Sequence, residues 1–278
     1  MLYVITLCGR EEDDPHIYKG NIALPTSQEP APLFCFGLTV IDKDNLQVFA
    51  YVNSLLGKKT DFTQVVPTIY YGITDELTLT IGQPIAAKFK YQNRQSSGIG
   101  DFFIQGEYAF YNKDRPSYAN QATLVAAVTF PSGSLKKTPP TGFGSPTFFL
   151  GATACHMNID WYIFAGLGGL LTTPHNSDQL PNSIFYQWGI GRNLYYISKK
   201  LIVTLTAEFF GSYTKGNRIR GTHYKNFDDN NFFIGPSLWV TTERFTFNPG
   251  IAFSLYSNKN DPGIGKFLIS FETGWTFN

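Results

Sequence analysis

Hydrophobic and polar residues alternate along most of the chain with a period of two. Near the C-terminus, for example, Phe267, Ile269 and Phe271 alternate with Ser270 and Glu272. Successive side chains of a β-strand point to opposite faces, so this alternation predicts strands with one apolar and one polar face. Long stretches with helical periodicity are absent from the sequence.

The alternation predicts twelve strands, separated by breaks that are rich in Gly, Pro and Asn. They cover residues 45–55, 61–71, 76–90, 100–111, 120–130, 146–156, 159–172, 183–197, 200–213, 230–241, 243–256 and 265–277. Each segment is long enough to cross a bilayer when the strand is tilted.

The connections between these strands alternate in length. They are short or moderate after the even-numbered strands and longer after the third, fifth, seventh, ninth and eleventh, as at residues 91–99, 131–145 and 214–229. Short turns on one rim and long loops on the other are typical of outer-membrane barrels. We therefore predict an all-β fold, a single transmembrane antiparallel up-and-down β-barrel of about 12 strands, with short periplasmic turns and long extracellular loops.

Aromatic residues gather at both ends of the predicted strands. On the short-turn side we expect Tyr108, Tyr162, Tyr195, Trp275 and Phe277 at the membrane interface, where amphipathic rings are favoured. A soluble β-sandwich would show the same alternation, but no membrane interface would favour aromatic rings at both ends of its strands. The two aromatic belts therefore favour the membrane barrel.

Composition and charge narrow the class further. Charged residues make up 15% of the chain, below the roughly 25% of ordinary soluble domains. No segment approaches the roughly 18 consecutive apolar residues of a transmembrane helix, which excludes a helical membrane protein. A formal net charge of +1 excludes a general nucleic-acid-binding surface.

The cysteines predict no metal site and no disulfide framework. Cys8, Cys35 and Cys155 are odd in number and far apart in the sequence, without metal-ligand spacing. A pair between Cys35 and Cys155 stays open as an alternative. We expect neither a metal nor a cofactor.

Residues 1–44 lack the barrel alternation and include acidic and proline-rich stretches. We expect them to form a poorly structured N-terminal arm or a truncated leader, and residues 45–278 to form the barrel. A plug that enters the barrel is the less favoured alternative. Residues 1–9 are apolar but lack a basic n-region, so an outer-membrane location implies a missing or truncated signal peptide.

Four short motifs occur in order at barrel spacing. They are Tyr71-Gly72-Ile73-Thr74, Gly98-Ile99-Gly100-Asp101, Phe130-Pro131-Ser132-Gly133 and Gly274-Trp275-Thr276-Phe277. Through them, residues 44–278 resemble the family of transporter-like outer-membrane proteins named after the meta-pathway of phenol degradation. The resemblance implies a single outer-membrane barrel and a role in the uptake of aromatic compounds. Barrel proteins usually end on an aromatic residue, which the barrel assembly machinery recognises. This chain departs from that pattern because Asn278 follows the final aromatic residue, Phe277.

The polar strand faces predict the lining of the lumen. Its candidate residues are Lys88, Lys90, Asp101, Gln105, Glu107, Glu208, Asn248 and Glu272. They could select a polar solute. Alternatively, opposite charges such as Lys88, Lys90 and Glu107 could pair and fill a narrow interior, the interpretation we favour for a barrel between eight and sixteen strands.

Basic residues also occur in the predicted long loops and on the lipid face. The loop residues are Lys136, Lys137, Lys215, Arg218, Arg220 and Lys225, which could bind lipopolysaccharide phosphates or gate an entrance, although solvated loops are the favoured interpretation. Arg192 shares the lipid face with Trp188 and Ile190. Either it extends to lipid phosphates, or a bulge rotates it inward.

These features predict a passive channel or transporter for a small apolar or aromatic solute in the bacterial outer membrane. The alternatives are a structural or surface-interaction barrel with an occluded lumen and functional loops and, third, an outer-membrane lipid hydrolase. We predict no enzyme, because His156 is the only histidine in a predicted strand and no serine lies at nucleophile spacing from it. The expected partners are outer-membrane lipid, lipopolysaccharide, barrel assembly machinery and a small apolar solute, with no nucleic acid.

Overall fold

The structure, a computed structural model, describes residues 18–57, 60–174, 181–215, 217–219, 222–224, 229–257 and 266–277. The strands are β1 (Leu46–Leu56), β2 (Thr60–Thr74), β3 (Leu77–Gly82), β4 (Ile85–Tyr91), β5 (Arg94–Ile99), β6 (Phe102–Arg115), β7 (Tyr118–Phe130), β8 (Thr147–Asn158), β9 (Trp161–Thr172), β10 (Asn182–Ile197), β11 (Leu201–Lys215), β12 (Asn217–Ile219), β13 (Thr222–Tyr224), β14 (Asp229–Thr242), β15 (Phe245–Ser257) and β16 (Phe267–Phe277). Two short 3-10 turns, η1 (Gly20–Ile22) and η2 (Thr26–Gln28), precede them. Among these residues, no helix is long and apolar enough to cross a membrane.

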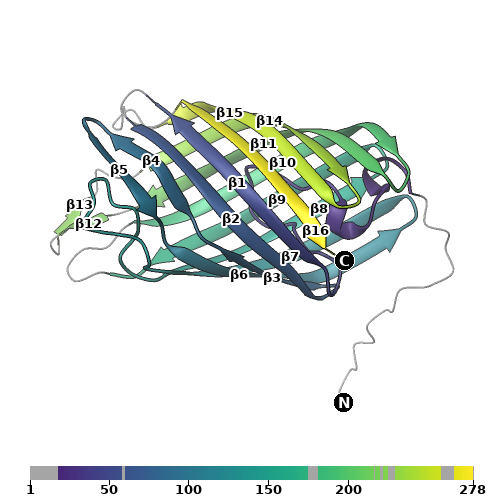
Figure 1. The fold of residues 1–278 in the computed structure, drawn as a ribbon, viewed down its shortest axis with the longest axis horizontal. Coiled ribbons are helices and arrows are strands. Elements are labelled where there is room, and N and C mark those ends of the chain that lie inside the picture. The colour runs from purple at the N-terminus through teal and green to yellow at the C-terminus, as the bar shows by residue number, and fades with distance from the viewer. Residues whose placement is uncertain are drawn as a thin grey trace, which may run out of the picture.

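The strands form one closed antiparallel barrel (Figure 1). β1 closes it by pairing with both β2 and β16. β3 and β4 both pair with β2, so they form one wall segment that is interrupted at Gln83 and Pro84. β5 and β6 likewise form one segment, while β12 and β13 make a separate hairpin. The barrel therefore has twelve wall segments, which confirms the predicted fold.

The predicted strand ends differ most from the structure at the fourth wall segment. It begins with Arg94 in β5, whereas the sequence predicted a start at residue 100. The predicted long loop at residues 91–99 is therefore wrong: a turn at Gln92 and Asn93 joins β4 to β5. Gln92 adopts the left-handed conformation, with φ 55°, that such a tight turn needs. The run of Ser and Gly residues that suggested a loop instead pairs with β4.

The two faces of the wall follow the predicted alternation. Inward-pointing polar residues such as Thr78, Thr204 and Thr246 are buried, whereas outward-pointing Leu150 and Leu167 are 66% and 61% exposed. An apolar outer face is what a lipid-facing barrel needs.

Four of the five predicted interface aromatics lie on the outer face. Tyr108, Tyr195, Trp275 and Phe277 are exposed. Tyr162 is instead buried inside the barrel, where it packs against Phe164. The prediction for Tyr162 was wrong because its neighbour Trp161 points outward, and two successive strand residues cannot face the same side.

The N-terminal arm, which we define as residues 18–45, lies inside the barrel at the end where the C-terminus is found (Figure 1). Its residues Ala23, Leu24, Leu33, Leu38 and Ile41 are buried. For residues 18–44 the structure therefore differs from the poorly structured arm that the sequence favoured, and it has the plug that was the alternative. Residues 1–17 lie outside the described residues.

Candidate functional site

The arm enters and leaves the lumen at the short-turn rim. At its beginning, the Asn21 backbone N–H donates to the carbonyl oxygen of Ile159 over 2.9 Å, and the Thr204 hydroxyl donates to Asn21 Oδ1 over 2.6 Å. At its end, the Asp44 N–H donates to the carbonyl of Gly72 over 2.8 Å. Because both ends are fixed at one rim, the segment between them forms a loop that rises into the lumen and returns.

Gln28 fixes the first limb of this loop to the barrel wall. Its side chain is buried, and its Nε2 donates to the hydroxyl of Thr276. The hydroxyls of Thr241 and Thr246 donate to its Oε1 over 2.7 and 3.2 Å. One arm residue thus joins β14, β15 and β16.

Glu208 of β11 binds the top of the loop. The backbone N–H groups of Leu33 and Phe34 each donate to a different oxygen of this carboxyl group over 2.9 Å. Ser237 Oγ donates to Oε1, also over 2.9 Å. Glu208 is fully buried, so it supplies the acceptors that these buried amides would otherwise lack.

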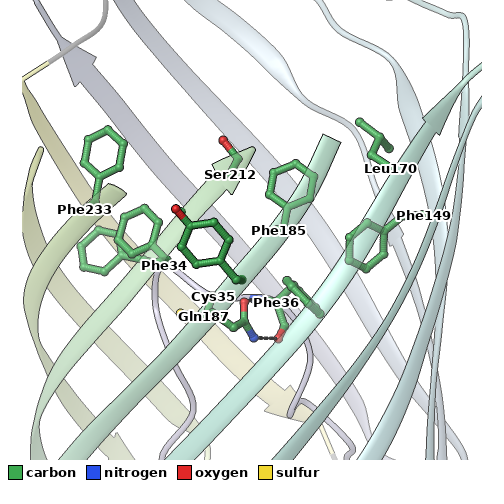
Figure 2. A pocket seen from close by; sticks show the side chains of 12 residues that line it. Phe34, Cys35, Phe36, Phe149, Leu170, Phe185, Gln187, Ser212 and Phe233 are labelled. Atoms are coloured by element: carbon green, nitrogen blue, oxygen red, sulfur yellow. Dashed lines mark hydrogen bonds between the residues drawn. The ribbon is translucent and has the colours of Figure 1, made fainter. Parts of the chain in front are cut away.

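Gln187 and Glu107 complete the polar support of the arm. The Phe36 N–H donates to Gln187 Oε1 over 2.8 Å, and Gln187 Nε2 donates back to the Phe36 carbonyl over 2.6 Å (Figure 2). Further on, the Thr39 N–H donates to Glu107 Oε2 over 3.0 Å, and Gln105 holds the other oxygen over 2.8 Å. These inward-facing side chains therefore accept backbone N–H groups of the arm, as the carbonyl groups of a neighbouring strand would.

Glycines in the wall make room for the aromatic residues of the arm. A Cβ atom at Gly151 or Gly168 would come within 2.8 or 3.0 Å of the Phe36 ring. At Gly235 or Gly250 it would come within 2.8 or 2.9 Å of the Phe34 ring. Real Cβ atoms essentially never approach closer than 3.0 Å, so a larger residue at Gly151, Gly235 or Gly250 would force the arm or the wall to shift.

Above the top of the arm, toward the long-loop side, lies a cavity of about 500 Å³. Its walls are lined by Phe34, Cys35, Phe36, Phe149, Leu170, Phe185, Tyr186, Gln187, Phe210, Gly211, Ser212 and Phe233 (Figure 2). The rings of Phe34, Phe210 and Phe233 form a stack with successive centroids 5.3 Å apart. Phe149 contacts Phe36 edge to face at 4.8 Å. The arm thus contributes two of the six phenylalanines.

The aromatic cavity is suited to flat apolar molecules. Gln187, its most polar lining residue, already has both ends of its amide bonded to the arm. Additional rings can stack on the exposed faces and edges of the phenylalanines. The volume also falls within the roughly 300–1,000 Å³ of small-molecule sites.

Several predicted lumen residues lie in the interior. Glu107, Glu208, Asn248 and Glu272 are buried there. Glu272 lies opposite Tyr51 of β1 and Asn248 of β15. The lumen at this level contains the arm as well as these side chains.

The predicted pairing of Lys88 and Lys90 with Glu107 is not found. Lys88 forms an ion pair with Asp61 at 3.2 Å, and Lys90 is exposed. The reason is the interrupted wall segment: β4 pairs with β5, whereas Glu107 of β6 lies opposite Thr78 of β3.

Asp101 connects two of the sequence motifs. Its carboxyl oxygens accept the backbone N–H groups of Gly133, over 2.7 Å, and Phe143, over 2.5 Å. Ser132 Oγ accepts the N–H of Phe102 and donates to the Gly100 carbonyl. Asp101 therefore fixes the long loop at residues 131–145 to the barrel.

The predicted loop cations are only partly described. Lys136 is exposed, and Lys137 Nζ donates to the carbonyl of Ser97. Arg220 and Lys225, and the side chains of Lys215 and Arg218, lie outside the described residues.

Cys35 and Cys155 are free thiols that contact the same buried cluster around Tyr162 and Phe164, so the Cys35–Cys155 pair left open by the sequence is not bonded. Within the described ranges, no three His, Cys, Asp or Glu side chains are grouped so that they could hold a metal ion.

Residues 43–271 match the family described as "Putative MetA-pathway of phenol degradation". The chain belongs to this family. This phenol-degradation family member is similar in structure to an outer membrane channel from Pseudomonas putida F1, with a TM-score of 0.67 and 13% identity over 90% of this chain and 99% of that one. It is also similar to the NanC porin, with a TM-score of 0.45 and 10% identity over 84% and 99% of the two chains. No curated protein matches it. The likeness to the P. putida channel confirms the outer-membrane barrel fold.

Proposed function

We propose that this barrel is a passive channel for small apolar or aromatic solutes in a bacterial outer membrane, and that the solute binds in the aromatic cavity during passage. The strongest support is the lining of that cavity, where six phenylalanines surround about 500 Å³ inside the barrel. A channel for ions or sugars would be expected to present polar groups at this level. The proposed passage requires neither a cofactor nor a catalytic residue.

In this proposal the arm is the barrier on the short-turn side. Its top is bonded to Glu208, Gln187 and Glu107, which lie on β11, β10 and β6. A solute that enters from the long-loop side meets Phe34 and Phe36 before it meets the rest of the arm. Complete passage therefore requires displacement of the arm, and these hydrogen bonds determine the free energy that the displacement needs.

The occupied lumen supports a second candidate, an occluded barrel whose long loops carry the function. The observation in its favour is the burial of Gln28 and Asn21 among wall residues at the short-turn side. This candidate predicts that the cavity binds no solute. Contacts of Lys136 and Lys137 with lipopolysaccharide, and insertion by barrel assembly machinery, remain proposals under either candidate.

Binding of 4-fluorotoluene tests the first proposal. Titration of the refolded barrel would be followed by the fluorine NMR signal of the ligand, with Ser212→Trp and Phe271→Ala variants beside the wild type. Ser212 lines the cavity, so its replacement by tryptophan fills the space, whereas Phe271 lies on the outer face and controls for binding to the lipid-facing surface.

We expect saturable binding to the wild type and Phe271→Ala, and its loss in Ser212→Trp. Equal signals from all three proteins would mean that the ligand partitions into detergent or the outer face. That outcome would favour the occluded barrel.

A further inference from the structure

Arg192 is a charged residue on the lipid-facing surface of the barrel. It follows Trp188 and Ile190 on the same face of β10, and all three side chains are exposed. The register of β10 shifts between Asn193 and Tyr195, after Arg192, so this bulge does not turn the guanidinium group into the lumen. Of the two alternatives raised by the sequence, the structure therefore has the outward one.

Trp161 positions this guanidinium group. Trp161 is the neighbour of Arg192 across the β9–β10 pair, and the guanidinium carbon lies 5.0 Å from the centre of the indole ring. A cation over an indole face is held by the ring quadrupole. The ring covers one face of the planar group and leaves its N–H donors at the edge free to bind an acceptor.

Among the described residues, no carboxylate forms an ion pair with Arg192. The ion pair found among them joins Lys88 to Asp61, far from this site. Asp160 lies in the adjoining turn, and its backbone oxygen accepts the N–H of Asn193 over 2.8 Å. Lys199, at the following turn, lies 4.5 Å above the ring of Tyr18 and so is engaged by the arm. Arg192 therefore forms no ion pair with a described side chain.

We propose that Arg192 and Trp161, with the exposed ring of Tyr195, bind the phosphate group of an anionic glycerophospholipid in the leaflet at the short-turn rim. A planar guanidinium group matches two phosphate oxygens at once. A charge on the lipid face of a barrel is costly near the midplane and tolerated near the interface, and Arg192 is close to the turn at residues 198–200. Tyrosine and tryptophan favour the same depth.

The surroundings favour a lipid over free phosphate. Trp188, which stacks on Phe209 with centroids 3.8 Å apart, and Ile190 continue the apolar surface from Arg192 toward the middle of the barrel. Acyl chains attached to the bound phosphate would cover this surface, whereas inorganic phosphate gains nothing from it. The inference rests on the membrane-spanning fold and is independent of the proposed channel.

Fluorescence of Trp161 tests the proposal. The barrel would carry Trp188→Phe, Trp239→Phe and Trp275→Phe, so that the indole under Arg192 is the only emitter, and heat modifiability would confirm folding. It would be placed in phosphatidylcholine vesicles with equal mole fractions of brominated phosphatidylglycerol or brominated phosphatidylcholine, since bromine quenches on contact. We expect a preference of about fivefold for the anionic lipid, the effect of one basic residue near an anionic surface.

Arg192→Gln should reduce this preference to about one, whereas Arg244→Gln should leave it unchanged, because Arg244 is an exposed arginine in the turn between β14 and β15. Equal quenching by both lipids in the parent protein would overturn the proposal. So would relief of quenching by excess inorganic phosphate, which would identify a site for the free ion. Native mass spectrometry gives a second readout, since the parent should retain more phosphatidylglycerol than Arg192→Gln.

Discussion

Replacing Glu208 with alanine should release the arm from the barrel wall. The carboxyl group accepts the N–H groups of Leu33 and Phe34, and both acceptors are lost in the variant. A buried donor without a partner costs about 1–3 kcal/mol. Two such donors weaken docking by at least about 2 kcal/mol, which raises the undocked population by a factor of about 30.

Hydrogen exchange of the refolded barrel measures this change directly. In Glu208→Ala, the amides of residues 33–39 should exchange about 30 times faster than in the wild type, while those of β7 and β8 keep their rates. Glu272→Gln is the matched control, because Glu272 is also a buried inward carboxyl group but lies opposite Tyr51 and Asn248 of the wall. Unchanged exchange in Glu208→Ala, or an equal increase in Glu272→Gln, would show that Glu208 does not hold the arm in place.

Two further predictions concern the docked arm. Gly151→Val places a side chain against the Phe36 ring, and such overpacking costs about 1–3 kcal/mol. Limited proteolysis should therefore cut the arm sooner in this variant than in the wild type. Adding Phe36→Ala should reverse the effect. Burial in the lumen, and then the nearby Asp114 and Asp42, raise the pKa of Glu29 well above its usual value. Since the docked state holds this proton more tightly, docking should be strongest below the ordinary glutamate pKa and should weaken as pH rises toward the raised one. Hydrogen-exchange rates of the arm amides, divided by their intrinsic rates at each pH, should therefore rise with pH in the wild type and stay constant in Glu29→Gln. If these ratios still rise with pH in Glu29→Gln, another group causes the pH dependence.

The wall of the barrel could be predicted from the sequence because each strand has to keep one face in lipid. That requirement is local, so alternation such as that of Phe267, Ile269 and Phe271 shows both the strand and its orientation. The same rule applies to aromatic residues near the strand ends. Phe149 and Phe185 have the inward parity of Gly151 and Gln187, and the structure places both in the cavity.

The arm could not be predicted from alternation because its hydrogen bonds join backbone amides to side chains far away in the sequence. Nothing local distinguishes Glu208, which binds Leu33 and Phe34, from an inward carboxyl group that faces water. The wall glycines were the available signal. Glycine in mid-strand indicates close approach of another backbone or ring, as Gly168 and Gly250 have toward Phe36 and Phe34.

In the proposed function, passage of an aromatic solute across the membrane runs through the phenylalanine-lined cavity. Its most direct test is the initial rate at which intact Gram-negative cells take up labelled toluene when they carry the wild-type barrel, the Ser212→Trp variant or no barrel. We predict a faster rate with the wild type, and a rate with Ser212→Trp that equals that of cells without the barrel. Equal rates in all three strains, with both proteins folded in the outer membrane, would contradict the proposed function.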